Sequence, residues 1–190
     1  MKEALLEPLL RRMRLARVRP WLLKGRTNDL LDVGCGWEAR LLHELEPFIS
    51  RGVGIDFKAP NIKSSKLSTV SARLTDRLPF EAASFDVVTM LAVLEHLERP
   101  RDIVSEIGRI LRPGGRLILT VPSPAAKPVL EFLAFQVGIV SAAEIADHKE
   151  YFDREALMAL FGDSSTWSVV HHEYFQMRFN NFLVAERIEK

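Results

Sequence analysis

Residues 30–36 read Leu-Leu-Asp-Val-Gly-Cys-Gly, a short apolar run that leads directly into a glycine-rich turn. A second short run, Gly-Val-Gly-Ile-Asp over residues 52–56, ends in a carboxylate. Apolar runs that stop at turn residues are typical of buried strands in a parallel sheet. Glycine lets the backbone approach a ligand closely, and a carboxylate at the end of the neighbouring strand can accept hydrogen bonds from ribose hydroxyls. The two runs together predict a nucleoside-binding edge of an open α/β sheet.

The rest of the chain alternates apolar runs with amphipathic stretches, as expected of a parallel sheet with crossover helices. Beyond the strands at 29–33 and 52–56, the pattern predicts strands over 67–74, 85–91 and 116–121. It predicts helices over 37–46, 58–64 and 100–111. After residue 121, prolines break the pattern and an apolar segment follows. A helix over about 153–161, with Asp153 as its N-cap, precedes two strands at 167–175 and 178–187 that can pair as a hairpin.

The composition is that of an ordinary folded domain. The chain has 190 residues, of which 47% are hydrophobic and 27% charged, enough for a sizeable core. No apolar run reaches the ~18–20 residues that a membrane-spanning helix needs. Cys35 is the only cysteine, so an internal disulfide is excluded and no cysteine cluster can bind zinc. We therefore expect a cytoplasmic protein without a bound metal.

The N-terminal region, residues 1–28, differs from the remainder in its charge. Its first 26 residues hold eight lysines or arginines and two glutamates. A basic arm can contact nucleic acid or an anionic membrane surface. The leucines in this arm also form an apolar stripe that suits packing on the domain. We expect a basic amphipathic helix that packs on a domain formed by residues 29–190, which argues against nucleic acid as a partner and leaves peripheral membrane contact open.

Five motifs occur in order along the chain: Leu31–Gly36, Gly54–Asp56, Leu78–Val88, Leu94–Leu97 and Leu111–Leu117. In this order and spacing they resemble class I S-adenosylmethionine-dependent methyltransferases of the broad small-molecule type. The resemblance implies a Rossmann-like, doubly wound α/β fold. Its sheet would have seven mostly parallel strands, with the last strand antiparallel.

The resemblance also implies a cofactor, S-adenosylmethionine, with S-adenosylhomocysteine as the product. Asp32, Gly34, Cys35 and Gly36 would form the turn that cradles its methionine part, and Asp56 would bind the ribose hydroxyls. The adenine would be bordered by Phe57, and the far side of the cofactor by Met90, Leu91 and Ala92.

Two positions depart from the family pattern. Trp37 and Glu38 stand where the family usually has a small residue and a glycine, which bears on cofactor affinity. Leu74 stands where an acidic residue often holds the adenine amino group, so Asp76 is the candidate for that role.

Methyl transfer from a sulfonium mainly requires that the nucleophile be held in line with the methyl group. A general base is needed only when the nucleophile begins protonated, and no metal is required. His96, His148 and Tyr151 are the candidate catalytic residues. His96 follows the strand at 85–91, at the edge where such sheets bind ligands. His148 and Tyr151 lie between the apolar segment and the helix that begins after Asp153, where substrate often enters. A structural role is the alternative for each, and for Glu95.

The segment over about 122–150 is the main indication of the substrate. Phe132, Phe135 and Ile139 could form an apolar lid, with Leu133 and Val137 facing the sheet, which suggests a small apolar or lipid-like acceptor. Packing on the domain or a contact between oligomer subunits are the alternatives. The acceptor atom and the oligomeric state stay open.

Three other functions share some of these sequence features. A nicotinamide-dependent oxidoreductase would require Gly-x-Gly-x-x-Gly, whereas this turn ends in alanine at position 39. A non-catalytic binding or scaffold member of the fold is compatible with Trp37, Glu38 and Leu74. An RNA methyltransferase anchored by the basic arm is the last, although the segment after residue 91 lacks the signature for methylating a base amine.

Overall fold

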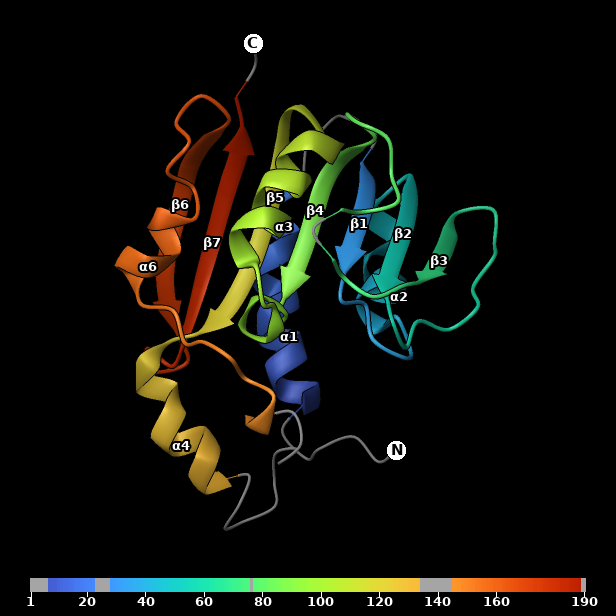
Figure 1. Ribbon diagram of the computed structural model, residues 1–190. Helices are drawn as coiled ribbons and strands as arrows, with labels where there is room; N and C mark the ends of the chain where they lie inside the picture. The colour runs from blue at the N-terminus through green and yellow to red at the C-terminus, as the bar shows by residue number, and fades with distance from the viewer. Residues whose placement is uncertain (1–6, 23–27, 76, 134–144, 189–190) are drawn as a thin grey trace.

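The protein folds around one seven-stranded sheet (Figure 1). The computed structural model describes residues 7–22, 28–75, 77–133 and 145–188. The strand order is β3-β2-β1-β4-β5-β7-β6, and β7 runs antiparallel to both of its neighbours. This confirms the expected Rossmann-like sheet with an antiparallel last strand. The strands are β1 Asp29–Val33, β2 Arg51–Asp56, β3 Leu67–Ser71, β4 Phe85–Leu91, β5 Leu111–Pro122, β6 Trp167–Phe175 and β7 Asn180–Arg187.

Helices cover both faces of the sheet (Figure 1). The α-helices are α1 Glu7–Val18, α2 Arg40–Leu45, α3 Pro100–Ile110, α4 Lys127–Phe132 and α6 Arg154–Ala159, and the short 3-10 helices are η1 Arg19–Trp21, η2 Glu46–Phe48, η3 Leu94–His96 and η4 Pro124–Ala126. Apolar residues of α3 and α6 pack on one face, and those of α1 and α2 pack on the other. The sheet is therefore buried on both sides, as its continuous apolar strands require.

Helix α1 is held to the domain by both apolar and charged contacts. Leu15 and Val18 are buried against the sheet. Arg11 forms an ion pair with Glu44 of α2, with 3.0 Å between Nε and Oε1. Arg17 likewise pairs with Glu173 of β6 at 2.9 Å. The division of the chain into an N-terminal arm, residues 1–28, and a domain, residues 29–190, stays a prediction.

The expected helix over 58–64 is wrong. Local side-chain hydrogen bonds satisfy the backbone there instead: the Ser64 hydroxyl accepts bonds from the N–H groups of Lys66 and Leu67. The Thr69 hydroxyl accepts a bond from the N–H of Ile62, at 2.9 Å. Such bonds compete with helix formation, and the segment forms a loop between β2 and β3.

Several element boundaries also differ from the expected ones. Strand β5 begins at Leu111 rather than 116, because Leu111 already pairs with Phe85 before a register irregularity. Helix α2 begins at Arg40 rather than 37, after Ala39 in a left-handed conformation with φ of 48°. Strand β3 ends at Ser71, and β7 begins at Asn180. The expected cap of α6 is confirmed: Asp153 Oδ1 accepts a bond from the N–H of Ala156 at 2.8 Å.

Candidate functional site

The turn after β1 is shaped by two glycines in the left-handed region. Gly34 has a φ of 79° and Gly36 a φ of 69°, values that side chains disfavour. A Cβ on Gly34 would lie 2.2 Å from Val93 Cγ2, so the segment after β4 packs directly on the turn. A Cβ on Gly36 would have no neighbour within 4 Å beyond the adjoining residues. The turn is thus braced on one side and opens into space at Gly36.

Asp56 ties the ends of β1 and β2 together. Its Oδ2 accepts a hydrogen bond from the N–H of Gly36 at 3.0 Å, and its Oδ1 accepts one from the N–H of Lys58 at 2.8 Å. Each carboxylate oxygen has a second lone pair, so the group can still accept bonds from two hydroxyls. The predicted proximity of the glycine turn and the carboxylate is therefore present in the structure.

Asp32 is buried beneath this turn. The Thr89 hydroxyl donates to Asp32 Oδ1 at 2.8 Å. Burial raises the pKa of Asp32 to about 7, and the nearby Asp56 charge adds to the rise while the Thr89 bond opposes it. Burial and the two carboxylates also raise the pKa of Cys35 to about 12. Cys35 thus remains a thiol at neutral pH.

The raised pKa of Asp32 gives a prediction about stability. Its carboxyl ionises near 3.8 when exposed but holds its proton up to about 7 when folded. Between these values the folded state binds more protons than the unfolded state, so the free energy of unfolding falls as pH rises. Glu95, whose pKa burial also raises to about 7, adds to the same trend. We expect Asp32→Asn to reduce the loss of stability between about pH 5 and pH 7.5, as measured by urea unfolding. Asp102→Asn, at an exposed carboxylate on α3, is the control, and an equal effect of both substitutions would contradict the assignment.

The side chains of the other predicted cofactor residues differ in how much of their surface is exposed. Phe57 follows Asp56, and 55% of its surface is exposed. Its ring is flanked by Lys58, whose Nζ is 4.8 Å from the ring centroid, and by Arg73. Met90 is fully buried in the core, whereas Leu91 and Ala92 are half-buried. Asp76 lies outside the described residues.

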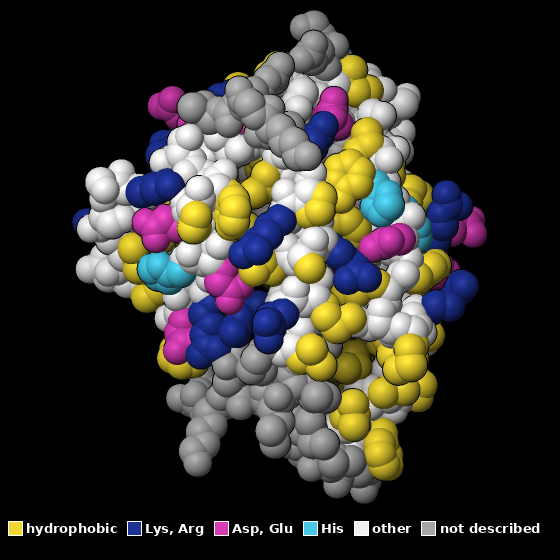
Figure 2. Space-filling view, turned by 180° about the vertical axis from the view of Figure 1, so that it is seen from behind, with side chains coloured by type: hydrophobic (Ala, Val, Ile, Leu, Met, Phe, Trp, Pro, Cys, Tyr) yellow, Lys and Arg dark blue, Asp and Glu magenta, His cyan; other side chains and the backbone are white. Residues whose placement is uncertain are grey.

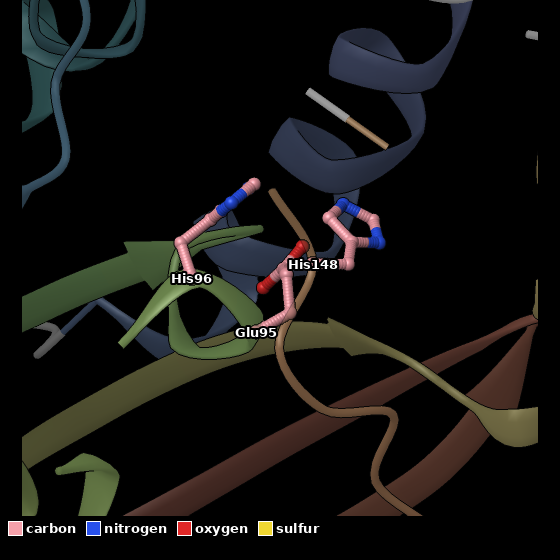
Figure 3. A group of neighbouring side chains, drawn as sticks. All are labelled: Glu95, His96 and His148. Carbon is pink, nitrogen blue, oxygen red and sulfur yellow. The ribbon is translucent and has the colours of Figure 1, made fainter. Parts of the chain in front are cut away.

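The three predicted catalytic residues are brought together with Glu95. His96 and Glu95 belong to η3, directly after β4, and His148 comes from the segment before α6 (Figure 3). The imidazole centroids of His96 and His148 are 4.8 Å apart. His148 Nδ1 lies 3.2 Å from the hydroxyl of Tyr151. The backbone joins the two segments, because the N–H of Lys149 donates to the carbonyl of Glu95 at 2.8 Å.

The electrostatics of this group follow from its burial. Burial and the neighbouring His96 lower the pKa of His148 to about 4, so this imidazole is neutral at neutral pH. The pKa of Tyr151 is raised, first by burial and then by the carboxylates of Glu131 and Glu95. Glu95 is 1% exposed. The sequence includes Glu95 in the motif at residues 94–97, but its burial could not be predicted because it depends on tertiary packing.

His148 and Tyr151 line a pocket of about 510 Å³ beside α4. The walls of the pocket combine apolar and charged side chains. They are Pro124, Lys127, Glu131, Ile145, Ala146, His148, Lys149, Glu150 and Tyr151.

Helix α4 presents apolar side chains to solvent near this pocket. Val129 is 36% exposed and Phe132 58% exposed. Hydrophobic side chains gather at the corresponding corner of the molecule, at the lower right of Figure 2. Phe135, Val137 and Ile139, the other members of the predicted lid and its inner face, lie outside the described residues.

Residues 31–119 match the family described as "Methyltransferase domain". The 27-O-demethylrifamycin SV methyltransferase of Amycolatopsis mediterranei is 32% identical over 147 residues, which cover 67% of this chain and 54% of that protein. The chain spans about half the length of the curated relatives it matches first.

Two solved structures show the same fold at low sequence identity. One is the putative methyltransferase in complex with the Trm112 activator of Haloferax volcanii, with a TM-score of 0.74 and 17% identity over 94% of this chain and 91% of that one. The other is the magnesium protoporphyrin IX methyltransferase of Synechocystis with bound S-adenosylhomocysteine. Its TM-score is 0.67, with 19% identity over 93% of this chain and 83% of that one. The family match and the curated relative, with the five motifs and the sheet order, support membership in the class I S-adenosylmethionine-dependent methyltransferases, whose fold the two solved structures share.

Proposed function

We propose that this protein transfers a methyl group from S-adenosylmethionine to an oxygen atom of a small acceptor. The observation that carries the proposal is the edge formed by β1 and β2, where the Asp56 carboxylate holds the Gly36 N–H beside open space. That arrangement suits the cofactor chemically: a carboxylate for two hydroxyls and a glycine turn without a side chain in the way. The oxygen acceptor follows from the similarity to an enzyme whose name specifies an O-linked methyl group.

The bound cofactor would supply an activated methyl group, and the protein would hold the cofactor and the acceptor in position. Asp56 and the turn at Gly34 and Gly36 would fix the cofactor, while the pocket beside α4 would hold the acceptor. Holding the two reactants in line accounts for most of the rate enhancement that such a displacement needs. His148 lines the pocket, and because its imidazole is neutral at neutral pH it can accept a hydrogen bond that orients an acceptor hydroxyl.

The acceptor that the pocket favours is a small molecule with both an apolar body and a polar group. Ile145 and Pro124 provide apolar walls, and Lys127 and Glu131 provide charged ones.

The helices in the described part of the chain are all too short or too polar to span a membrane.

The contacts of α1 favour this function over RNA methylation. Arg11 and Arg17 are engaged in ion pairs with the domain, and the Arg14 Nε atom is buried. These arginines are therefore not displayed as a free basic surface.

The direct test is transfer of a labelled methyl group from S-adenosylmethionine to a panel of small acceptors. The panel pairs phenols and hydroxyquinones with their O-methylated forms, which lack the free hydroxyl. Label incorporated into the hydroxyl compounds alone supports the proposal. Binding of the cofactor without transfer to any acceptor would instead support the non-catalytic alternative.

The exposed ring of Phe132 gives a second prediction. Because 58% of its surface is exposed, Phe132→Ser should leave folding intact. Phe132 lies on α4 and not among the residues of the β1–β2 edge, so we expect cofactor affinity to be unchanged. We expect a severalfold rise in KM for the acceptor, on the order of the loss of one partly buried apolar side chain. Met177→Ser, at a residue that is 83% exposed in the β6–β7 turn, is the control. Unchanged kinetics, or dissociation of an oligomer, would contradict a role in acceptor binding.

A further inference from the structure

Glu95, His96 and His148 form a cluster of metal-ligand types at the end of β4. Each offers one ligand atom, and these atoms all lie within 4.8 Å of one another. In Figure 3 the Glu95 carboxylate points into the space between the two imidazoles. Glu95 and His96 precede β5 in the sequence, and His148 follows it. The N–H of Lys149 donates a hydrogen bond of 2.8 Å to the carbonyl of Glu95, which holds these two segments together.

The Glu95 side chain supplies an independent indication of a ligand. Its Oε2 atom is buried and has no hydrogen-bond partner in the part of the chain that the structure describes. Buried carboxylate oxygens are nearly always hydrogen-bonded or bound to a cation. Arg14, whose charge acts on Glu95, does not bond to this oxygen, and its own Nε atom is likewise buried without a partner among the described residues. The carboxylate oxygen is therefore left for another cation.

Each histidine has its Nδ1 atom beside a polar partner. His96 Nδ1 lies 3.1 Å from Asp147 Oδ2, and His148 Nδ1 lies 3.2 Å from the Tyr151 hydroxyl. When Nδ1 is engaged by a carboxylate or another polar group, the ring orientation is fixed and Nε2 is presented to the metal. Each imidazole thus has an outer partner and a nitrogen left for coordination.

We propose that Glu95, His96 and His148 bind a divalent first-row transition-metal ion such as Zn²⁺ or Mn²⁺. Two imidazoles and one carboxylate make a common ligand set for such ions, with further positions open. Bonds of about 2.1 Å require ligand atoms about 3.4 Å apart, so the side chains would close by about 1 Å around the ion. His148 also lines the pocket beside α4, so an open position of the metal would be accessible to an acceptor oxygen there.

A metal ion in this place would have a chemical use. It lowers the pKa of a hydroxyl bound to it, so it would prepare an acceptor hydroxyl for methylation. This use rests on the proposed function, whereas the metal site itself does not. The test of the metal site therefore measures metal binding in the absence of cofactor and acceptor.

The experiment is calorimetric titration of the full, chelator-treated chain with Zn²⁺ and with Mn²⁺, supported by the visible spectrum of bound Co²⁺. We expect one ion per chain. Glu95→Gln and His148→Gln should each weaken binding about tenfold or more, the scale on which loss of ligand geometry acts. Glu98→Gln, at an exposed neighbour of η3, and His171→Gln, on β6, are the matched controls and should bind as the wild type does.

Circular dichroism of each variant separates loss of the site from loss of the fold. If Glu95→Gln unfolds, the half-buried His148 provides the same test, since His148→Gln removes a ligand outside the core. No saturable binding by the folded wild type would overturn the proposal. Wild-type affinity in both folded site variants would overturn it as well, whatever the controls show.

Discussion

Asp56→Ala is expected to weaken binding of S-adenosylhomocysteine by about 1.5–3 kcal/mol, the usual scale for hydrogen bonds to a charged group. The substitution removes the carboxylate that faces the open side of the turn. It also leaves the N–H groups of Gly36 and Lys58 without their acceptor. The loss therefore combines missing ligand contacts with a less ordered turn.

Two comparisons separate these contributions. Asp56→Asn keeps one oxygen acceptor and the side-chain shape, so its loss of affinity should be smaller. Glu81→Ala, at an exposed residue before β4, should bind normally. Calorimetric titration gives the affinities, and circular dichroism verifies folding. Wild-type affinity in folded Asp56→Ala would show that the ribose is held elsewhere.

Gly34→Ala is expected to lower the free energy of unfolding by about 2–5 kcal/mol. The left-handed φ of 79° costs about 1–2 kcal/mol for a residue with a side chain. Overpacking adds about 1–3 kcal/mol, because the new Cβ would lie 2.2 Å from Val93 Cγ2 in the absence of any shift. Urea unfolding of the isolated chain measures the change.

The chain offers a matched control for this substitution. Gly162 has room for a methyl group, since the nearest atom to its Cβ position is the Ala159 carbonyl oxygen at 3.4 Å. Gly162→Ala should therefore change stability by much less. Equal effects of the two substitutions would mean that the Gly34 turn is not braced by the segment after β4.

Elements that depend on a continuous apolar run could be predicted closely from the sequence. The runs at 29–33 and 85–91 give strands β1 and β4 with those bounds. Where local side-chain bonds compete, as at Ser64 and Thr69, the pattern predicted a helix that does not form. The early start of β5 also depends on pairing with β4, which the local pattern around Gly114 and Gly115 conceals.

Part of the candidate site could likewise be predicted from the sequence, and part could not. Gly36 and Asp56 could be placed together from sequence because parallel neighbouring strands end at one edge. The proximity of Glu95 to His148 could not, since it depends on how the segment after α4 returns to the sheet. The expectation of no metal rested on the single cysteine and on the chemistry of methyl transfer, and it stays untested; the proximity of His96 and His148 depends on the fold. Asp76 stays a prediction.

The central claim is that the edge between β1 and β2 binds the nucleoside part of the cofactor. Calorimetric titration of the wild-type chain with S-adenosylhomocysteine tests it most directly. We expect saturable binding of one molecule per chain with a micromolar Kd. No binding by a folded sample would contradict the claim, and would mean that Trp37, Glu38 and Leu74 have adapted this edge to another use.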